Sequence, residues 1–453
     1  MKTNTLIVLL LLLPSLLLKA QNPVVQTCYT SDPAPMVYGD TFWLYTGHDV
    51  AEGTTKYCMH DWHVYSSTDM VNWTDHGPRL SILDFDWMES GAWASQCIER
   101  NGKFYWYVCG RDKETRTKAL GVAVGDSPVG PFRDALGKKL AGGSNRDIDP
   151  TVWIDDDGRA YLYWGNRALF YAELNSDLLS LKGDTLYKVP LEEKSFGRVD
   201  KSKGIRNFEE GPWLMKRNGK YYLLYAAGGV PEHLAYSMSD SPEGPWEYKG
   251  ELMSLYDSGS ATNHCGVVEY KGHHYLVYHT GKLPGGGSVN RSVAIEEFQW
   301  NDDGTLPVVK PTDKGVDPVG TLNPYHRVEA ETIAHAGGVT TEPNGKSGVY
   351  VSQIHHGDSI SVRVVDFGDK APRKMIVSAA SALYGGTMEV RLDAPNGPLL
   401  CAIDVRGTGG WEAWKRFEAP INKGVTGVHD LYFKFKGMRG ISLFNYDWWK
   451  LVK

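Results

Sequence analysis

The chain has 453 residues, a formal net charge of −6 and 23% charged side chains. These values suit two or three globular domains and argue against a nucleic-acid partner, because nucleic-acid-binding surfaces are normally basic. The 25 Tyr and 15 Trp outnumber the 13 Phe. Most aromatic side chains therefore carry a hydrogen-bonding group, as is common at hydrated binding surfaces.

The first 20 residues have the pattern of a secretory signal peptide. Lys2 supplies positive charge, residues 6–18 are almost wholly apolar, and Ala20 is a small residue at the expected cut. The apolar stretch is too short to span a bilayer comfortably, and no later segment is long enough. We therefore expect a signal peptide at 1–20 and an exported protein, periplasmic or secreted, without membrane contact after cleavage. An uncleaved anchor is the alternative.

One motif, a strand, a polar turn with Gly and an aromatic strand, recurs five times. The copies are residues 36–45, 98–107, 152–163, 214–225 and 267–278. Asn-Gly, Asp-Gly or Lys-Gly between β-branched and aromatic runs marks most of them as β-hairpins. A second half-motif follows several copies, as in Tyr236-Ser-Met-Ser-Asp-Ser-Pro-Glu-Gly-Pro-Trp246. Two hairpins in each repeat, at the spacing of these five copies, are the signature of propeller blades. Residues 21–320 are therefore predicted to form a five-bladed β-propeller.

The repeat ends at a polar Pro/Gly stretch, residues 311–321, which indicates a linker or closing segment. Short strands with turn signals follow, as at residues 359–365 and 431–435. That pattern over residues 325–453 predicts a β-sandwich of the jelly-roll kind, so the whole chain is expected to be all-β. The six cysteines are scattered without CxxC spacing, and mostly buried free thiols are expected.

A carboxylate or a histidine lies just before the first strand of four repeats. Asp32 and Glu210 lie four residues before the strand starts, whereas Asp149 and His264 lie three residues before. The innermost strands of a propeller line its central channel, so these side chains are expected to converge at one end of it.

Taken singly, each carboxylate could be a turn or cap residue. Three in one pocket would repel one another and separate their pKa values, which is how one site holds both an acid and a base. We therefore predict a catalytic cluster of Asp32, Asp149 and Glu210. Glu209 is a rival to Glu210, but strand alternation sends it to the opposite face, and the register of Asp32 selects Glu210.

These segments resemble glycoside hydrolase family 43, the five-bladed-propeller arabinofuranosidases, xylosidases and arabinanases. The matching motifs are Ser31-Asp-Pro-Ala-Pro35, Trp93-Ala94, Ile148-Asp-Pro150 and Glu210-Gly-Pro212. The resemblance implies that Asp32 is the general base, that Asp149 tunes and orients the acid, and that Glu210 is the general acid. An inverting glycosidase needs such a pair on opposite faces of the sugar, with room for a water molecule.

The resemblance also implies the substrate and further pocket residues. The expected reaction is inverting, exo-acting release of terminal α-L-arabinofuranose, β-D-xylose or both from plant-type polysaccharide side chains or oligosaccharides. Arg291 matches a substrate-binding arginine of the family, although it could be an exposed strand cation. Trp93 and Trp164 could each stack on sugar or pack in the core, and Trp93 is preferred for the pocket because it lies just before an inner strand. His264 is expected in the channel, with calcium near it or in a purely structural role.

The C-terminal region resembles a family 6 carbohydrate-binding module. The matching pieces are Val328-Glu-Ala-Glu331, Thr408-Gly-Gly-Trp-Glu-Ala-Trp414 and Leu443-Phe-Asn-Tyr-Asp-Trp-Trp449. The resemblance implies a structural calcium, whose oxygen ligands would be Glu329, Glu331 and Asp447. It also implies a sugar site with Tyr350, Trp411 and Asn445 as candidates, and Trp414 is expected to pack in the core. A degenerate module that only buttresses the propeller is the alternative.

Other functions fit the same pattern less well. A β-galactosidase, a galactanase or an endo-arabinanase could use the same propeller. A retaining, sucrose-cleaving propeller enzyme normally has an Asn-Asp-Pro-Asn motif, from which Ser31-Asp-Pro-Ala34 departs. A non-catalytic carbohydrate-binding protein would not need all three carboxylates.

Overall fold

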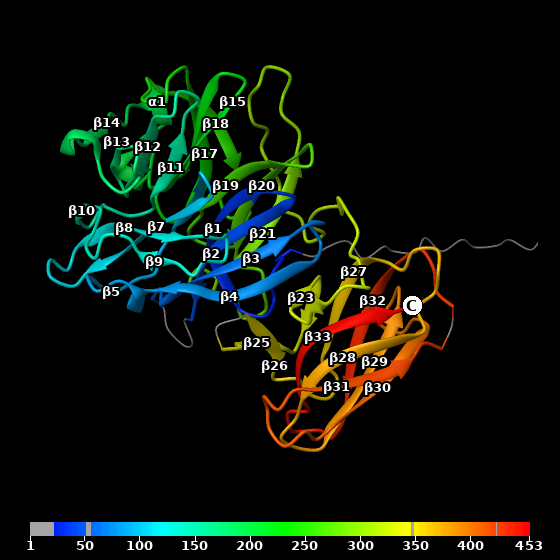
Figure 1. The fold of residues 1–453 in the computed structure, drawn as a ribbon. Helices are drawn as coiled ribbons and strands as arrows, with labels where there is room; N and C mark the ends of the chain where they lie inside the picture. The colour runs from blue at the N-terminus through cyan, green and yellow to red at the C-terminus, as the bar shows by residue number, and fades with distance from the viewer. Residues whose placement is uncertain (1–21, 51–55, 346–347, 423) are drawn as a thin grey trace, which may run out of the picture.

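The computed structural model describes residues 22–50, 56–345, 348–422 and 424–453. The predicted signal peptide lies outside the described residues. Strands form five sheets around an axis and then a two-sheet sandwich (Figure 1). The helices of the described ranges are α1 (Glu193–Phe196) and three short 3-10 segments, η1 (Ile82–Asp84), η2 (Lys182–Asp184) and η3 (Lys201–Lys203). None of these is long and apolar enough to cross a membrane.

Each of the five sheets is one propeller blade, which confirms the predicted fold class. Blade 1 contains β1 (Tyr29–Tyr38), β2 (Thr41–Asp49), β3 (Asp61–Ser67) and β4 (Trp73–Ser81). Blade 2 contains β5 (Met88–Ser90), β6 (Gln96–Arg100), β7 (Lys103–Asp112), β8 (Lys118–Gly125), β9 (Arg133–Asp134) and β10 (Ala141–Ser144). Blade 3 contains β11 (Thr151–Ile154), β12 (Ala160–Trp164), β13 (Leu169–Leu174) and β14 (Tyr187–Val189).

The last two blades complete the ring. Blade 4 contains β15 (Glu210–Arg217), β16 (Lys220–Ala227), β17 (His233–Ser239) and β18 (Glu247–Met253). Blade 5 contains β19 (Cys265–Tyr270), β20 (His273–Thr280) and β21 (Ser292–Phe298). Residues 22–24 run beside β21, where the Val24 amide donates to the Val293 carbonyl at 2.8 Å. The start of the described chain therefore covers the outer edge of the last blade.

The inner hairpins form where the sequence predicts them. Three of them turn on two residues with positive φ, namely Asn101-Gly102 (55° and 75°), Asn218-Gly219 (49° and 77°) and Lys271-Gly272 (50° and 80°). Two positive φ angles define the type I′ turn, whose twist matches that of the paired strands. Local turn chemistry thus sets where these inner hairpins form.

Aromatic side chains hold neighbouring blades together. Tyr45 of blade 1 packs edge-on against Trp106 of blade 2 at 4.9 Å between ring centroids, and Phe42 packs against Tyr270 of blade 5 at 5.7 Å. Such edge-to-face pairs add to the burial of large apolar area. The aromatic strands of the repeat are therefore the interfaces between blades.

The sandwich has two antiparallel sheets. One contains β22 (Val328–Glu329), β25 (Thr340–Pro343), β26 (Val349–Ser352), β28 (Lys374–Ala380), β31 (Lys415–Pro420) and β33 (Asn445–Val452). The other contains β24 (His335–Gly337), β27 (Ser359–Asp366), β29 (Gly385–Leu392), β30 (Leu399–Arg406) and β32 (Val428–Lys436). Phe433, Tyr446 and Trp449 pack between them in the core.

The sandwich is joined to the propeller by a shared sheet edge. β23 (Thr332–Ile333) pairs with β4 and becomes the fifth strand of blade 1. Beside it, Asn72 Nδ2 donates to the Arg363 carbonyl and the Arg363 amide donates to Asn72 Oδ1, both at 2.8 Å. The segment at residues 311–321 is also packed, since the Val319 amide donates to the Asp69 carbonyl at 3.0 Å. It is a closing segment instead of a free linker.

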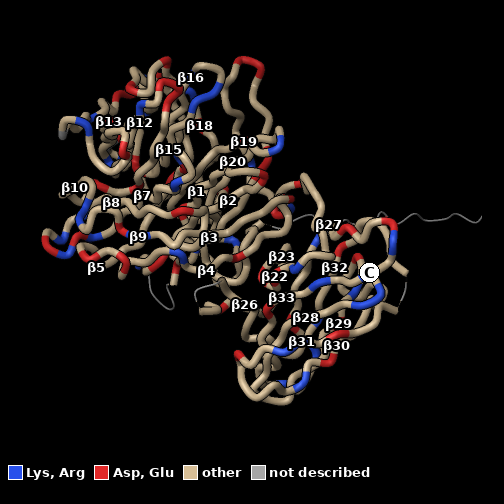
Figure 2. The backbone as a smooth tube through the Cα atoms, in the orientation of Figure 1, with Lys and Arg blue, Asp and Glu red and all other residues tan. Residues whose placement is uncertain are grey.

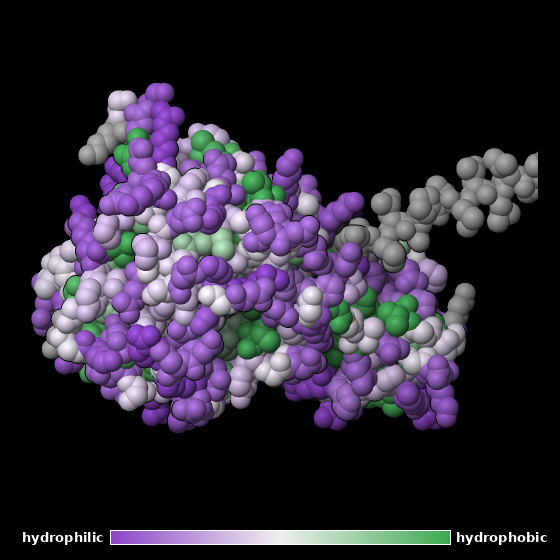
Figure 3. All heavy atoms as spheres, turned by 90° about the horizontal axis from the view of Figure 1, so that it is seen from above, coloured by the Kyte–Doolittle hydropathy of each residue, from purple (hydrophilic) through white to green (hydrophobic). Residues whose placement is uncertain are grey.

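Charged residues of both signs are spread through the described chain. Lys, Arg, Asp and Glu are interspersed along the backbone of both parts (Figure 2). Hydrophilic residues cover most of the face in Figure 3, with apolar residues singly or in small groups. All six cysteines are free thiols, as expected, and four of them are buried.

Candidate active site

The innermost strands of all five blades begin at one cavity of about 190 Å³. Its lining residues are Asp32, Tyr57, Trp93, Lys118, Ile148, Asp149, Glu210, Thr262, Asn263, His264 and Arg291. A larger hollow of about 660 Å³ lies beside blades 2 and 3, near residues 136–140 and 179–181. That hollow contains none of the predicted catalytic carboxylates. The smaller cavity is the candidate active site, because it gathers all three of them.

Asp32 stands at a bend of β1. Its φ is 46°, and the pairing of β1 with β2 shifts between Ser31 and Ala34. Left-handed backbone is uncommon for a residue other than glycine, although Asp tolerates it better than most. The Asp32 amide donates to His279 Nδ1 at 3.3 Å, and His279 Nε2 donates to the Thr262 carbonyl at 2.7 Å. These bonds hold the bend and aim the carboxylate into the cavity.

A buried arginine pairs with Asp32. Arg291 Nη1 donates to Asp32 Oδ1 at 2.8 Å. Burial raises the pKa of Asp32, but the Arg291 guanidinium and the His279 ring outweigh that effect and hold its pKa below the ordinary value. Asp32 is therefore ionised, as a base must be.

Arg291 is itself fixed by a second carboxylate. Asp49 accepts from the Arg291 amide at 2.9 Å, from Nε at 2.9 Å and from Nη2 at 3.0 Å. The guanidinium also lies over the Tyr57 ring, 4.8 Å from its centroid. Arg291 is thus a buried pocket residue and not an exposed strand cation. Its partners Asp49 and Tyr57 were not found from the sequence.

Asp149 and Glu210 form the other half of the cavity. Asp149 has a φ of 61°, and its Oδ2 accepts from the Gly211 amide at 3.0 Å. Glu210 Oε2 accepts from Asn166 Nδ2 at 2.6 Å. Burial, and then the Glu210 and Asp32 carboxylates, raise the pKa of Asp149 well above its ordinary value. Burial also raises the pKa of Glu210, although Lys118 and Asn166 act in the opposite direction.

The cause of the raised Glu210 pKa differs in part from the sequence-based expectation. Burial is the main cause, whereas the mutual repulsion of the pair appears chiefly in the pKa of Asp149. Because two buried carboxylates titrate together, a proton is retained by the pair and not by one residue independently.

The register argument that selected Glu210 was wrong in detail. Asp32, Asp149 and Gly211 each precede a proline and have φ values of 46°, 61° and 64°. These three residues are therefore equivalent, and Glu210 reaches the cavity from one position earlier. A better reason excludes Glu209.

Glu209 is only 1% exposed and is occupied by two arginines. Arg167 Nε donates to its Oε1 at 2.6 Å, and Arg206 Nη1 donates to its Oε2 at 3.0 Å. Both oxygens of Glu209 are therefore engaged by arginine side chains, which leaves neither free to protonate a leaving group. Glu209 does not line the cavity.

The remaining residues complete the wall of the cavity. Trp93 is half-buried in the wall, and Lys118 Nζ, which the sequence did not indicate, lies 5.2 Å from its ring centroid. Trp164 is instead core, where its indole donates to Asp147 Oδ1 at 2.8 Å. Burial lowers the pKa of His264 to about 4, so its ring is neutral near neutral pH.

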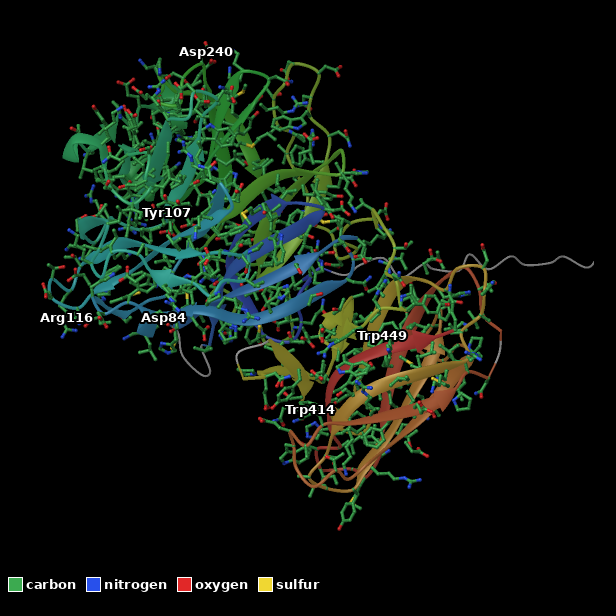
Figure 4. All side chains as sticks on the ribbon, in the orientation of Figure 1. Asp84, Tyr107, Arg116, Asp240, Trp414 and Trp449 are labelled. Atoms are coloured by element: carbon green, nitrogen blue, oxygen red, sulfur yellow. The ribbon has the colours of Figure 1, made fainter. Side chains whose placement is uncertain are left out.

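In the sandwich, the buried ring of Tyr350 in β26 packs against Trp414, which precedes β31. The rings of Tyr350 and Trp414 meet edge-on at 5.2 Å, and Tyr350 OH donates to Glu342 Oε2 at 3.2 Å. Trp411 is 36% exposed, and its carbonyl accepts from Asn445 Nδ2 at 2.9 Å. Trp414 was expected in the core, but it is half-buried and outside the core cluster, whereas Trp449 is fully buried (Figure 4).

The three carboxylates expected to bind calcium lie in one neighbourhood. Arg327 pairs with Glu329 at 2.7 Å and reaches Asp447 at 3.5 Å. Burial, and then Glu329, Asp75 and Asp447, raise the pKa of Glu331 to about 9. Glu331 Oε2 is buried without a hydrogen-bond partner. An oxygen donor set with such an orphaned atom fits a calcium ion, and Arg327 would have to move aside.

Comparisons with known proteins agree with this architecture. Residues 20–306 match Glycosyl hydrolases family 43, and residues 329–453 match Carbohydrate binding module (family 6). An arabinoxylan arabinofuranohydrolase of Paenibacillus polymyxa is 33% identical over 95% of this chain and 74% of that protein. An arabinoxylan arabinofuranohydrolase of Bacillus subtilis (strain 168) is 31% identical over 95% of this chain and 92% of that protein.

A solved structure extends the similarity to the whole fold. The glycoside hydrolase family 43 arabinoxylan arabinofuranohydrolase from Bacillus subtilis, in complex with cellotetraose, superposes with a TM-score of 0.81 at 29% identity, covering 95% of this chain and 97% of that one. The chain therefore belongs to glycoside hydrolase family 43 and carries a family 6 carbohydrate-binding module. It is a glycosidase, and its substrate is an oligosaccharide or a polysaccharide.

Proposed function

We propose that this enzyme releases terminal α-L-arabinofuranose from the side chains of arabinoxylan, with terminal β-D-xylose as the second substrate, and that it inverts the anomeric configuration. The single observation that carries the reaction type is the unequal environment of the pocket carboxylates, since Asp32 has a buried arginine partner and Glu210 has none. The sugar rests on relatives that are arabinoxylan arabinofuranohydrolases over 95% of this chain. The cavity of about 190 Å³ supports exo action, because it is smaller than pockets for drug-sized ligands and suits one terminal pentose.

In this mechanism Asp32 accepts a proton from a water molecule, and that water attacks the anomeric carbon. Arg291 keeps Asp32 ionised and holds its Oδ1 in place. Inverting enzymes keep base and acid roughly 6.5–9.5 Å apart so that the water fits between base and sugar. Asp32 in β1 and Glu210 in β15 approach the cavity from different blades, as this arrangement requires.

Glu210 gives its proton to the leaving oxygen. Asn166 binds its Oε2, which leaves Oε1 to carry the proton. The Gly211 amide favours the charged form of Asp149, as Asn166 does for Glu210, so the buried pair holds its proton jointly, and we assign delivery of that proton to Glu210. Asp149 therefore acts as a positioning and tuning residue, and Trp93 stacks on the sugar.

The sandwich would hold the enzyme on its polymer. Tyr350 and Trp414 are the proposed sugar contacts, with Asn445 and Trp411 beside them. Calcium held by Glu329, Glu331 and Asp447 would give this module a structural ion. Residues 1–20 would direct the chain out of the cytoplasm, so that it meets plant polysaccharide in the periplasm or outside the cell.

Hydrolysis of matched aryl glycosides tests the proposal. The arabinofuranoside should be the best substrate, the xylopyranoside second, and the galactopyranoside should be cleaved at background rate. Proton NMR at early times should show the anomer opposite to that of the substrate. A retained anomer would overturn the inverting mechanism. Preference for galactosides, or cleavage confined to internal bonds of arabinan, would overturn the substrate assignment.

A further inference from the structure

Two histidines and an aspartate meet on one face of blade 1, outside the active site. His48 lies near the end of β2, and the pairing of Gly47 with Trp62 places it opposite Asp61 in β3. His63 lies two residues further along β3, on the same face as Asp61. His48 Nδ1 is 2.8 Å from Asp61 Oδ1, and His63 Nε2 is 3.4 Å from the same oxygen. Within the described ranges, these residues are the one group of three potential ligands whose donor atoms lie within 4.8 Å of one another.

The spacing suits a small divalent cation. Zinc binds imidazole nitrogen and carboxylate oxygen at roughly 2.0–2.2 Å, so tetrahedral ligands stand about 3.4 Å apart. The pair at 3.4 Å already has that spacing, and the pair at 2.8 Å would open by a small side-chain rotation. Asp61 is 26% exposed, His48 22% and His63 9%. Solvent can therefore reach the site and fill an open position.

One neighbour already orients a ligand. Tyr65 OH lies 3.3 Å from His63 Nδ1, on the side of the ring away from Asp61. A hydrogen bond to one imidazole nitrogen fixes the ring and leaves the other nitrogen for a metal, as in most protein metal sites. The same Tyr65 hydroxyl is 3.3 Å from Cys28 Sγ, so the supporting group is itself fixed.

We propose that His48, Asp61 and His63 bind a divalent transition-metal ion such as Zn²⁺, with water in the remaining position. Two imidazoles and one carboxylate favour such an ion over Ca²⁺ or Mg²⁺, which prefer oxygen ligands. The site is thus distinct in chemistry and place from the oxygen-ligand calcium site considered in the sandwich. It is also distinct from His264, which lies in the active-site cavity.

The site would act on the pocket through the strands that carry it. His48 is followed by Asp49, which makes three hydrogen bonds to Arg291. The chain between β2 and β3 also brings Tyr57 to the cavity wall. An ion bound across β2 and β3 would tie the two ends of this connection together. Its expected role is to stabilise blade 1, and it takes no part in bond cleavage.

Calorimetric titration of the tag-free, full-length protein with Zn²⁺ tests the site. The protein is first stripped with a chelator and then kept in excess Ca²⁺, so that any calcium site is filled. One Zn²⁺ should bind per chain, and a hundredfold excess over Kd should raise Tm by about 2–4 °C or more. His63→Gln and His48→Gln should each weaken binding at least tenfold.

His273→Gln is the matched control, because His273 also pairs with a carboxylate on a blade strand, Glu297 at 2.8 Å. That variant should bind Zn²⁺ as the wild type does. The proposal would be overturned if the wild type bound no stoichiometric Zn²⁺, or if both ligand variants bound Zn²⁺ as tightly as the wild type. The three residues would then form a plain His–Asp–His hydrogen-bond network. If one ligand variant fails to fold, the other variant and the wild-type Tm shift still decide.

Discussion

The propeller pocket and the sandwich each gather three carboxylates, and the two clusters differ in how many of these carboxylates contact an arginine. Of the three pocket carboxylates, only Asp32 pairs with Arg291, whereas burial raises the pKa of both Asp149 and Glu210. In the sandwich, Arg327 pairs with Glu329 and touches Asp447, while Glu331 is buried with an orphaned oxygen. In the pocket, an arginine that pairs with one of the three carboxylates makes that residue a base and leaves the others to hold a proton. In the sandwich, Arg327 could move aside, and the three carboxylates could then bind a metal ion. The partner of each carboxylate therefore decides its chemistry.

Removing the proposed base should have the largest effect. Asp32→Asn keeps the shape but cannot accept the proton, so kcat/KM should fall by about 10³-fold or more. Aryl arabinofuranoside kinetics measure the loss. Asp40→Asn, at the exposed turn of the same hairpin, is the matched control and should keep full activity. A loss of less than tenfold in Asp32→Asn would remove Asp32 from its role.

Replacing Arg291 should remove the cation that distinguishes Asp32 from the other two pocket carboxylates. In Arg291→Gln, burial remains and the guanidinium is lost, so the pKa of Asp32 should rise. The base must be ionised, so kcat/KM of the variant should fall as pH drops through this raised pKa. The wild type, whose Asp32 pKa is low, should keep its activity there. At neutral pH we expect a loss of about 10²-fold from poorer positioning.

The pH–activity profiles of the two proteins check this expectation. Identical acid limbs in wild type and Arg291→Gln would mean that Arg291 does not control the ionisation of Asp32.

The aromatic pair of Tyr350 and Trp414 should matter for polymers only. Trp414→Ala removes the ring that faces Tyr350, so affinity for xylo-oligosaccharides should fall roughly tenfold while aryl glycoside kinetics stay unchanged. Trp411→Ala is the comparison, because its more exposed ring lacks the Tyr350 partner. A larger loss in Trp411→Ala would return the sugar site to the sequence-based choice.

Calcium should have the smallest effect, and on stability alone. Adding Ca²⁺ to chelator-treated protein should raise Tm by about 2–4 °C, since ligands that bind only the folded state stabilise it. Glu331→Gln should lose this response and gain stability without the ion, because it removes a buried unpaired carboxylate. An unchanged Ca²⁺ response in that variant would place the ion elsewhere.

Features fixed by local chemistry were predictable from the sequence. Asn-Gly and Lys-Gly turns require positive φ at both residues, and they marked the inner hairpins from which the five blades follow. Asp32 and Asp149 could be found because each precedes a proline at the start of an inner strand. Glu210 was found as well, although it lies one residue before the bulge position that Asp32 occupies in β1.

Features set by distant contacts were not predictable in this way. Asp49 and Arg291 are 242 residues apart in the chain, and only the closed ring brings them together. Tyr57 and Lys118 reach the cavity from segments outside the repeat motif. The pairing of β23 with β4 joins two domains through backbone bonds that no side-chain pattern marks. Only the folded loop shows that the ring packed against Tyr350 is that of Trp414.

The division of labour between Asp32 and Glu210 is tested most directly by leaving-group dependence. Across a series of aryl arabinofuranosides, Glu210→Gln should lose about 10²–10⁴-fold in kcat/KM with poor leaving groups and little with good ones, because only the former need protonation. Asp32→Asn should lose equally across the series. Equal losses in Glu210→Gln for all leaving groups would contradict the assignment of Glu210 as the acid.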